Sequence, residues 1–400
     1  MRRGKLRDAA WLTAQRVTAY GWVLLVLELA LLAFLTAGTY ELIVPLERPV
    51  STDYVSFYAA GALADAGTPA LAYNYDAHYA AQQQAAQPGI VYNYFFYPPV
   101  MLLLCGVLAW LPYLLSFFVF QFSGLALFVA MARGILAKPG WSWLPPLLAS
   151  PAGFYVFGLG QNSFLSAALF GGATLVVDRR PWLGGLLFGL LCYKPHFGLL
   201  IPIALLAGQH WRALASATLT VLGLVAASVA LFGVQTWKAF FETFATSPAI
   251  YESGRITLAG FVSVFGGARV TGLPPSAAYA IQAASALVVA GLVAWAWYRR
   301  CSIEVRAAML IAGTFLAVPL ALVYDLTIVA GAGLWLVRAG RRDGFLPYEK
   351  MLLVLAFLVP VMSRGAALQL YLPVGVLGAL IPMALAVRRA LRERRGTAAA

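Results

Sequence analysis

The sequence contains few charged residues for its length. Lys, Arg, Asp and Glu make up 11% of the 400 residues, whereas a soluble globular chain carries about 25%. Hydrophobic residues account for 62% of the chain, and the mean hydropathy is +0.81. Such a chain has too little charge to cover a soluble surface, which excludes a soluble enzyme and a disordered protein. The composition predicts an integral membrane protein.

Cysteine is also scarce. Cys105, Cys192 and Cys301 lie in or beside apolar runs, and none has CxxC spacing. This pattern excludes a disulfide scaffold and a zinc site. We find no nucleotide-binding fingerprint and no basic groove with interleaved aromatic residues. The sequence therefore predicts no metal or other cofactor and no nucleic-acid partner.

The net charge of +13 comes from short basic clusters between apolar runs. Clusters of this kind mark cytoplasmic loops in membrane proteins. This rule predicts one polytopic membrane domain over residues 1–400, with both termini and a basic tail at 388–400 in the cytoplasm. It places a long polar loop, residues 45–97, outside. We expect the chain in a plasma membrane, the inner membrane of a bacterium, with its first span kept as a signal anchor.

The apolar runs predict an all-α, GT-C-like bundle of about twelve membrane-spanning helices. Several are shorter than a lone span should be, which is tolerated where helices line a protein-enclosed cavity. Residues 100–111 are expected to form a re-entrant or interfacial piece. The predicted spans are 22–44, 113–133, 143–158, 163–177, 182–193, 197–208, 213–234, 276–298, 307–323, 326–338, 347–363 and 368–387.

The external loop carries an acidic residue close to the end of the first predicted span. Asp53 is followed by Tyr54 and Tyr58 at helical spacing, and Ser51 and Thr52 could cap that helix. Two interpretations stay open. The carboxylate is held over a cavity at the lipid–water boundary, or it only complements the dipole of the helix.

Two further polar motifs follow the first. Tyr97 ends an aromatic run before Pro98-Pro99, which forces a chain reversal. That run suits either an interfacial girdle or sugar stacking. Gln161 and Asn162 then lie between two apolar spans. Asn162 or the neighbouring serine could simply cap the next helix, whereas capping does not explain Gln161.

Charged residues also interrupt apolar runs later in the chain. Lys194 and His196 flank a proline, and Asp325 follows Tyr324. A lysine left in lipid without a partner costs several kcal/mol, so Lys194 must face a polar cavity, reach the interface or meet an anion. His196 is either a packing residue or a functional one. Asp325 is a functional candidate, and Arg255 could neutralise a phosphate or anchor the chain at the interface.

These motifs, in this order, resemble glycosyltransferase family 87 over roughly residues 20–340. The resemblance implies a GT-C-type mannosyltransferase that uses a polyprenyl-phosphate-linked sugar. It implies that Asp53 is the catalytic carboxylate, because the family type has an acidic residue in its first external loop. No second acid stands next to Asp53, unlike the paired acids common in GT-C enzymes, which argues against a metal.

The resulting hypothesis is inverting transfer of a hexose, by family resemblance mannose, to a lipid or glycan acceptor at the external face. Asp53 would accept the proton of the acceptor hydroxyl. Donor phosphate binding is assigned to Lys194, His196 and Arg255. The residues assigned to substrate binding are Tyr54, Tyr58, Tyr97, Gln161, Asn162, Tyr324 and Asp325.

Three alternatives remain. A transporter or flippase of lipid-linked sugar would concentrate its polar residues at mid-membrane and show inverted repeats. A protein similar to O-antigen ligases or polymerases would place its large loop late in the chain. A binding or structural membrane protein would not need these polar residues to converge.

Overall fold

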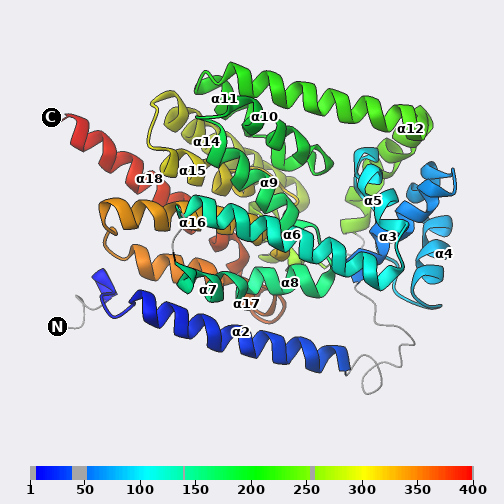
Figure 1. Cartoon of the computed structure of the whole chain (residues 1–400), viewed down its shortest axis with the longest axis horizontal. Coiled ribbons are helices and arrows are strands. Elements are labelled where there is room, and N and C mark those ends of the chain that lie inside the picture. The colour runs from blue at the N-terminus through cyan, green and yellow to red at the C-terminus, as the bar shows by residue number, and fades with distance from the viewer. Residues whose placement is uncertain (1–5, 38–51, 138–139, 253–256, 399–400) are drawn as a thin grey trace.

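The chain forms a bundle of α-helices (Figure 1). The computed structural model describes residues 6–37, 52–137, 140–252 and 257–398, and this part of the chain contains no β-strand. The expectation of an all-α polytopic membrane protein is confirmed.

Seven helical segments are long and apolar enough to cross a membrane, judged by length and composition among the described residues. Four shorter apolar segments accompany them, so the long candidates are fewer than the twelve or so crossings expected. The seven are Ala14–Leu35, Tyr113–Ile135, Trp211–Thr246, Pro275–Tyr298, Val323–Asp343, Glu349–Leu370 and Val374–Arg394. The four shorter ones are Pro99–Ala109, Ser163–Val176, Pro181–Tyr193 and Pro195–Ala207.

Three predicted spans differ from the helices observed. The first helix, α2, covers Ala14–Ala37, so it begins before residue 22, and residues 38–44 of the predicted span lie outside the described part. The predicted span 143–158 is broken into α7 (Leu144–Leu148) and α8 (Pro151–Leu159), because prolines interrupt it. The predicted span 213–234 continues as α12, Trp211–Glu252, with a kink at Gly233.

A fourth predicted span, 368–387, only overlaps α18 (Leu377–Ala398), and its first residues belong to α17 (Glu349–Leu370). The other spans agree in place with observed helices, to within several residues at each end. These helices are α6 (Tyr113–Ile135), α9 (Ser163–Val176), α10 (Pro181–Leu190), α11 (Ile201–Ala207), α14 (Pro275–Tyr298), α15 (Ile303–Ala317), α16 (Leu326–Asp343) and α17. Almost every residue of α15 is buried, because α14, α16 and α18 pack around it. This helix is the centre of the large hydrophobic core.

A smaller helical unit lies at the end of the bundle opposite both termini (Figure 1). It consists of α3 (Thr52–Asp65), a 3-10 turn at Pro69–Tyr73, α4 (Tyr75–Ala85) and α5 (Leu102–Ala109). Helices α3 and α5 approach closely at Gly61, where an added Cβ would stand 2.1 Å from the carbonyl oxygen of Cys105. This contact fixes the position of α3 and of Asp53 in its first turn.

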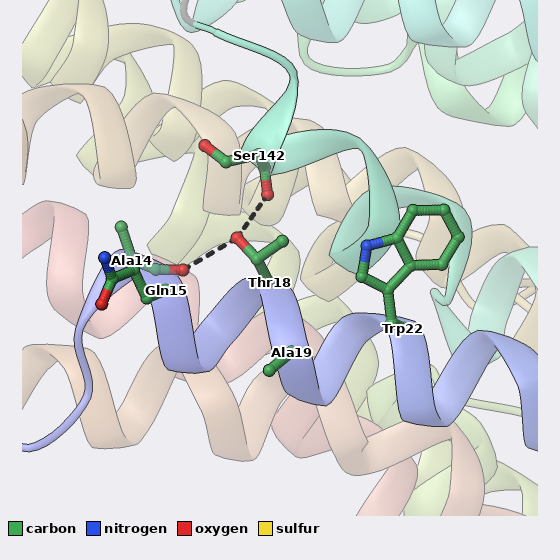
Figure 2. A pocket seen from close by; sticks show the side chains of 6 residues that line it. All are labelled: Ala14, Gln15, Thr18, Ala19, Trp22 and Ser142. Carbon is green, nitrogen blue, oxygen red and sulfur yellow. Dashed lines mark hydrogen bonds between the residues drawn. The ribbon is translucent and has the colours of Figure 1, made fainter.

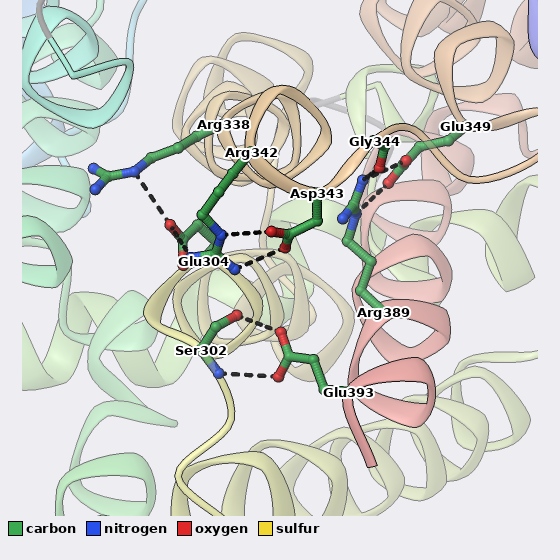
Figure 3. Close-up of polar contacts among 9 residues, drawn as sticks. All are labelled: Ser302, Glu304, Arg338, Arg342, Asp343, Gly344, Glu349, Arg389 and Glu393. Atoms are coloured by element: carbon green, nitrogen blue, oxygen red, sulfur yellow. Dashed lines mark hydrogen bonds and ion pairs between the residues drawn. The ribbon is translucent and has the colours of Figure 1, made fainter. Parts of the chain in front are cut away.

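The other end of the bundle is held by ion pairs between helix termini (Figure 3). The buried Glu304 carboxylate accepts contacts from Arg338 and Arg342 at 3.2 and 2.9 Å. The Arg389 guanidinium contacts both oxygens of Glu349 at 2.6 Å. Arginines from two of the basic clusters that the sequence assigns to the cytoplasm, at residues 338–342 and 388–395, therefore lie at this end of the structure.

Helix α2 lies along the side of the bundle (Figure 1). The Thr18 hydroxyl donates a hydrogen bond of 2.8 Å to the carbonyl oxygen of Ser142, beside a hollow of about 400 Å³ (Figure 2). The described lining of this hollow comes from α2 and Ser142, and it includes none of the predicted site residues. The hollow is a gap in the packing of α2.

Candidate active site

Asp53 is half-buried in the first turn of α3. Its Oδ2 atom accepts a hydrogen bond of 2.9 Å from the side-chain amide of Gln161. Burial raises the pKa of Asp53, while the Gln161 hydrogen bond and the positive charge of Lys194 act in the opposite direction. The environment therefore makes this carboxylate a stronger base than an ordinary aspartate.

Gln161 joins two of the predicted site residues. Its Oε1 atom accepts a hydrogen bond of 3.3 Å from the Tyr97 hydroxyl, while its Nε2 atom donates to Asp53. Its backbone carbonyl accepts a bond of 3.0 Å from the amide of Gln121 on α6. The preceding Gly160 has φ +71°, a left-handed conformation that favours glycine and ends α8. The amide of Gln161 is thus held in a fixed orientation toward Asp53.

Lys194 and Asp325 form a buried ion pair with an Nζ–Oδ1 distance of 2.8 Å. Lys194 lies where helix α10 and its 3-10 extension end and another turn begins, Pro195–Gly198. The Ser163 hydroxyl donates to the same Oδ1 atom at 2.7 Å, and the Leu322 amide donates to Oδ2 at 3.2 Å. Asp325 therefore has a cationic partner and two further hydrogen-bond donors in its buried position.

Aromatic rings surround the Lys194 ammonium group. Its Nζ atom is 5.5 Å from the ring centroids of Phe197 and Tyr324, and 6.0 Å from that of Tyr97. Such rings attract a desolvated cation through their negative faces. Tyr97 touches both parts of the site, because its hydroxyl bonds Gln161 and its ring faces Lys194.

The turn between α8 and α9 connects the two carboxylates. Gln161 bonds Asp53, and Ser163 bonds Asp325. Asn162 lies between them at the N-cap position of α9, yet its side chain makes no capping bond. It is 1% exposed, and neither side-chain polar atom has a hydrogen-bond partner among the described residues. A buried amide of this kind is a candidate partner for a substrate hydroxyl.

Two of the predicted substrate-binding residues, Tyr54 and Tyr58, contact the segments that neighbour α3. Tyr54 has no exposed surface, packs among the rings of Phe57, Tyr113, Phe117 and Phe120, and its hydroxyl bonds Ser116. The Tyr58 hydroxyl donates to the carbonyl oxygen of Leu111 at 3.0 Å. Both side chains attach α3 to its neighbours, and their role in substrate binding stays a prediction.

The predicted phosphate-binding residues are only partly brought together. His196 is half-buried two residues after Lys194, with its ring 4.2 Å from that of Phe197. Arg255 lies outside the described residues. Sequence reasoning missed Ser163 as a partner of Asp325, having considered it only as a helix cap. The available signal was the charge pattern, since one buried lysine and one buried aspartate require partners.

The profile of glycosyltransferase family 87 matches residues 95–323. This segment is more than half of the chain. The chain belongs to glycosyltransferase family 87. In this family member, the matched segment contains Tyr97, Gln161, Asn162 and Lys194, whereas Asp53 precedes it. No curated protein and no solved structure shows significant similarity to the chain.

Proposed function

We propose that this glycosyltransferase moves a hexose from a polyprenyl phosphate to a hydroxyl of a lipid or glycan acceptor. The proposed hexose is mannose. The observation that carries the proposal is the convergence of Asp53 and the Lys194–Asp325 pair on one turn, Gln161–Ser163, in a family 87 chain. One carboxylate is available as a base, and one cation lies nearby.

The proposed reaction is a single displacement at C1 of the sugar. The acceptor oxygen forms the new bond to C1 while Asp53 takes the hydroxyl proton. The bond from C1 to the phosphate oxygen breaks, and its electron pair goes to the phosphate. Attack from the face opposite the leaving group inverts the anomeric centre. Gln161 would hold Oδ2 of Asp53, so that the carboxylate presents a constant orientation to the acceptor.

Lys194 would stabilise the charge that develops on the leaving phosphate. Its ion pair with Asp325 supports this role, because the carboxylate holds the ammonium group in place within the buried site. Phosphate binding would add a second anion to Lys194, and Tyr324 and Tyr97 would line that position. Asn162 would contact a hydroxyl of the sugar.

A donor comparison tests the proposed chemistry. The purified full-length protein in lipid nanodiscs would be given radiolabelled polyprenyl-phosphate mannose or GDP-mannose, together with a membrane-lipid extract as acceptor. We expect label to move from the polyprenyl donor alone. Transfer from GDP-mannose, with none from the polyprenyl donor, would refute the proposed donor class.

We further propose that the site faces the exterior of a bacterial inner membrane, with both termini in the cytoplasm. The gathering of basic clusters at the end opposite α3 supports this orientation. Gln84 is exposed on α4 and Arg341 is exposed at the basic end. In intact cells, an impermeant thiol reagent should label the Gln84→Cys variant and spare the Arg341→Cys variant, with the unsubstituted protein as background. The reverse labelling would contradict this orientation.

A further inference from the structure

An aromatic surface lies on the small helical unit, away from the contacts of Asp53. Residues 92–97 form no helix or strand, and their rings contact the second residue along the chain: Tyr92 contacts Tyr94, Tyr94 contacts Phe96, and Phe95 contacts Tyr97. The side chains therefore alternate between two faces. Phe95 enters the core and Tyr97 joins the candidate active site. The other face carries the rings of Tyr92, Tyr94 and Phe96. Together with Tyr75 of α4, these rings form what we call the aromatic ladder.

The rings of the aromatic ladder contact one another in sequence. The centroid distances are 4.4 Å from Tyr75 to Tyr92, 4.8 Å from Tyr92 to Tyr94 and 5.2 Å from Tyr94 to Phe96. The last two rings are stacked, with 5° between their planes. A hollow of about 480 Å³ is lined by Tyr75, Val91, Tyr92 and Tyr94, and Tyr75 and Val91 are 49% and 82% exposed. The rings therefore border open space.

Polar contacts fix the aromatic ladder relative to α3. The buried His78 ring bonds the Tyr92 hydroxyl at 3.1 Å and the carbonyl oxygen of Ser56 at 3.0 Å. Ser56, one turn after Asp53, also donates from its hydroxyl to the carbonyl oxygen of Tyr94 at 3.2 Å. Burial lowers the pKa of His78 to about 4, so the ring is neutral near pH 7. The segment that carries the ladder is thus attached to the helix that carries Asp53.

A second clamp holds the same segment against α4. The Gln82 side chain donates to the backbone carbonyl oxygen of Asn93 at 2.6 Å and accepts from the backbone N–H of Asn93 at 3.0 Å. The backbone is therefore fixed on one side while the rings remain accessible on the other. Rigid aromatic side chains bind ligands at a low cost in conformational entropy.

The charge of this region favours an uncharged ligand. No Lys or Arg occurs between residues 49 and 132. A surface that recognises anionic lipid headgroups carries basic clusters, and this one has none. Tyrosines and amides offer apolar ring faces next to hydroxyl groups, which matches a sugar ring with its C–H and O–H faces.

We propose that the aromatic ladder binds the uncharged carbohydrate chain of a glycosylated acceptor. The carbohydrate would stack on the rings of Tyr92, Tyr94 and Phe96. The next residue, Tyr97, bonds Gln161, and Gln161 in turn bonds Asp53. That the bound carbohydrate is an acceptor rests on the proposed glycosyl transfer. Binding itself can be measured without turnover.

The test measures saccharide binding to full-length protein in zwitterionic nanodiscs by saturation-transfer difference NMR, with mannotriose and maltotriose as probes. The Asp53→Asn background prevents turnover. Tyr94→Leu should weaken binding of at least one probe roughly threefold to tenfold, since an aromatic contact contributes about 0.5–1.5 kcal/mol. Tyr94→Trp should restore it. The matched control is Tyr298→Leu, a 68% exposed tyrosine at the end of α14, which should change nothing.

Two outcomes would overturn the inference. One is an absence of saturation transfer from both probes, or equal transfer in the Tyr94→Leu variant. The other is that brominated lipids quench a dye on Val91→Cys while the Tyr94→Leu substitution leaves saccharide binding unaffected. That result would make the ladder a membrane girdle. Neither result changes the donor comparison, so failure of this inference is distinguishable from failure of the proposed function.

Discussion

Buried carboxylates at the two ends of this bundle have different partners. Glu349 is fully buried, and both its oxygens contact the Arg389 guanidinium at 2.6 Å. Asp53 is half-buried and bonds a neutral amide, that of Gln161. An arginine that contacts both oxygens of a carboxylate satisfies it through a strong bidentate pair of hydrogen bonds. An amide on one oxygen leaves a carboxylate that can still take a proton.

The Lys194–Asp325 pair resembles the Arg389–Glu349 pair in its burial and Asp53 in its place at the candidate active site. It is as buried as the Arg389–Glu349 pair, yet its cation is a lysine surrounded by aromatic rings at the candidate active site. A lysine ammonium group has three donors and can serve a second anion, whereas the Arg389 fork is engaged with one carboxylate. The comparison predicts that both pairs stabilise the fold and that only the first acts in transfer.

The largest effect is expected from breaking the Lys194–Asp325 pair. Lys194→Met leaves Asp325 buried without its cation, which should cost about 3–5 kcal/mol of stability and abolish transfer. The Lys194→Met/Asp325→Asn double variant should regain much of the melting temperature in detergent, because no uncompensated charge remains. It should still lack transfer activity. Wild-type turnover in the double variant would remove Lys194 from the site.

The pair at the other end should affect stability alone. Arg389→Met leaves Glu349 buried without its partner and should lower stability by about 3–5 kcal/mol. Turnover per folded molecule should remain within about twofold of the wild type, measured below the melting transition. A large loss of turnover in folded protein would show that the two ends are functionally coupled and would break the comparison.

A smaller effect is expected from Gln161→Leu. If Asp53 is the base as proposed, its ionised form is the active one, so turnover should fall as pH drops through a pKa that burial raises above the usual range near 4. Removing the Gln161 hydrogen bond, which lowers that pKa, should move the acidic limb of the pH–rate profile to higher pH. At neutral pH we expect a loss of about tenfold.

Gln121→Leu is the matched control for that shift. It removes the bond from α6 to the backbone of the same turn and leaves the Asp53 contact in place. This variant should lose stability without moving the acidic limb. If both glutamine variants shift the limb equally, Gln161 acts on the shape of the turn and not on the carboxylate.

The smallest effect is expected from Tyr58→Phe. It removes a hydroxyl that donates to the Leu111 carbonyl, which should cost about 0.5–1.5 kcal/mol of stability. The Michaelis constants for donor and acceptor should stay unchanged. A raised Michaelis constant would support the role in substrate binding that the sequence predicts for Tyr58.

The sequence predicted the places of most long helices, because long apolar runs determine them, but it missed the break between α7 and α8 and the full length of α12. It also selected Asp53, Gln161, Lys194 and Asp325, since polar side chains in apolar surroundings need a reason. It could not show that Lys194 and Asp325 are partners, because 131 positions separate them. It could not separate Tyr54 from Tyr97 either, since both follow aromatic patterns and only tertiary packing buries one of them completely.

The central claim is that Asp53 is the base. Its most direct test is the rate of hexose transfer from purified polyprenyl-phosphate mannose by Asp53→Asn protein in nanodiscs. Asp65→Asn and Asp76→Asn serve as matched controls, because both side chains are exposed on the same helical unit. We predict that Asp53→Asn keeps the melting temperature and loses about 10²–10⁴ in rate, while both controls retain wild-type turnover. Near-wild-type transfer by folded Asp53→Asn protein would contradict the account.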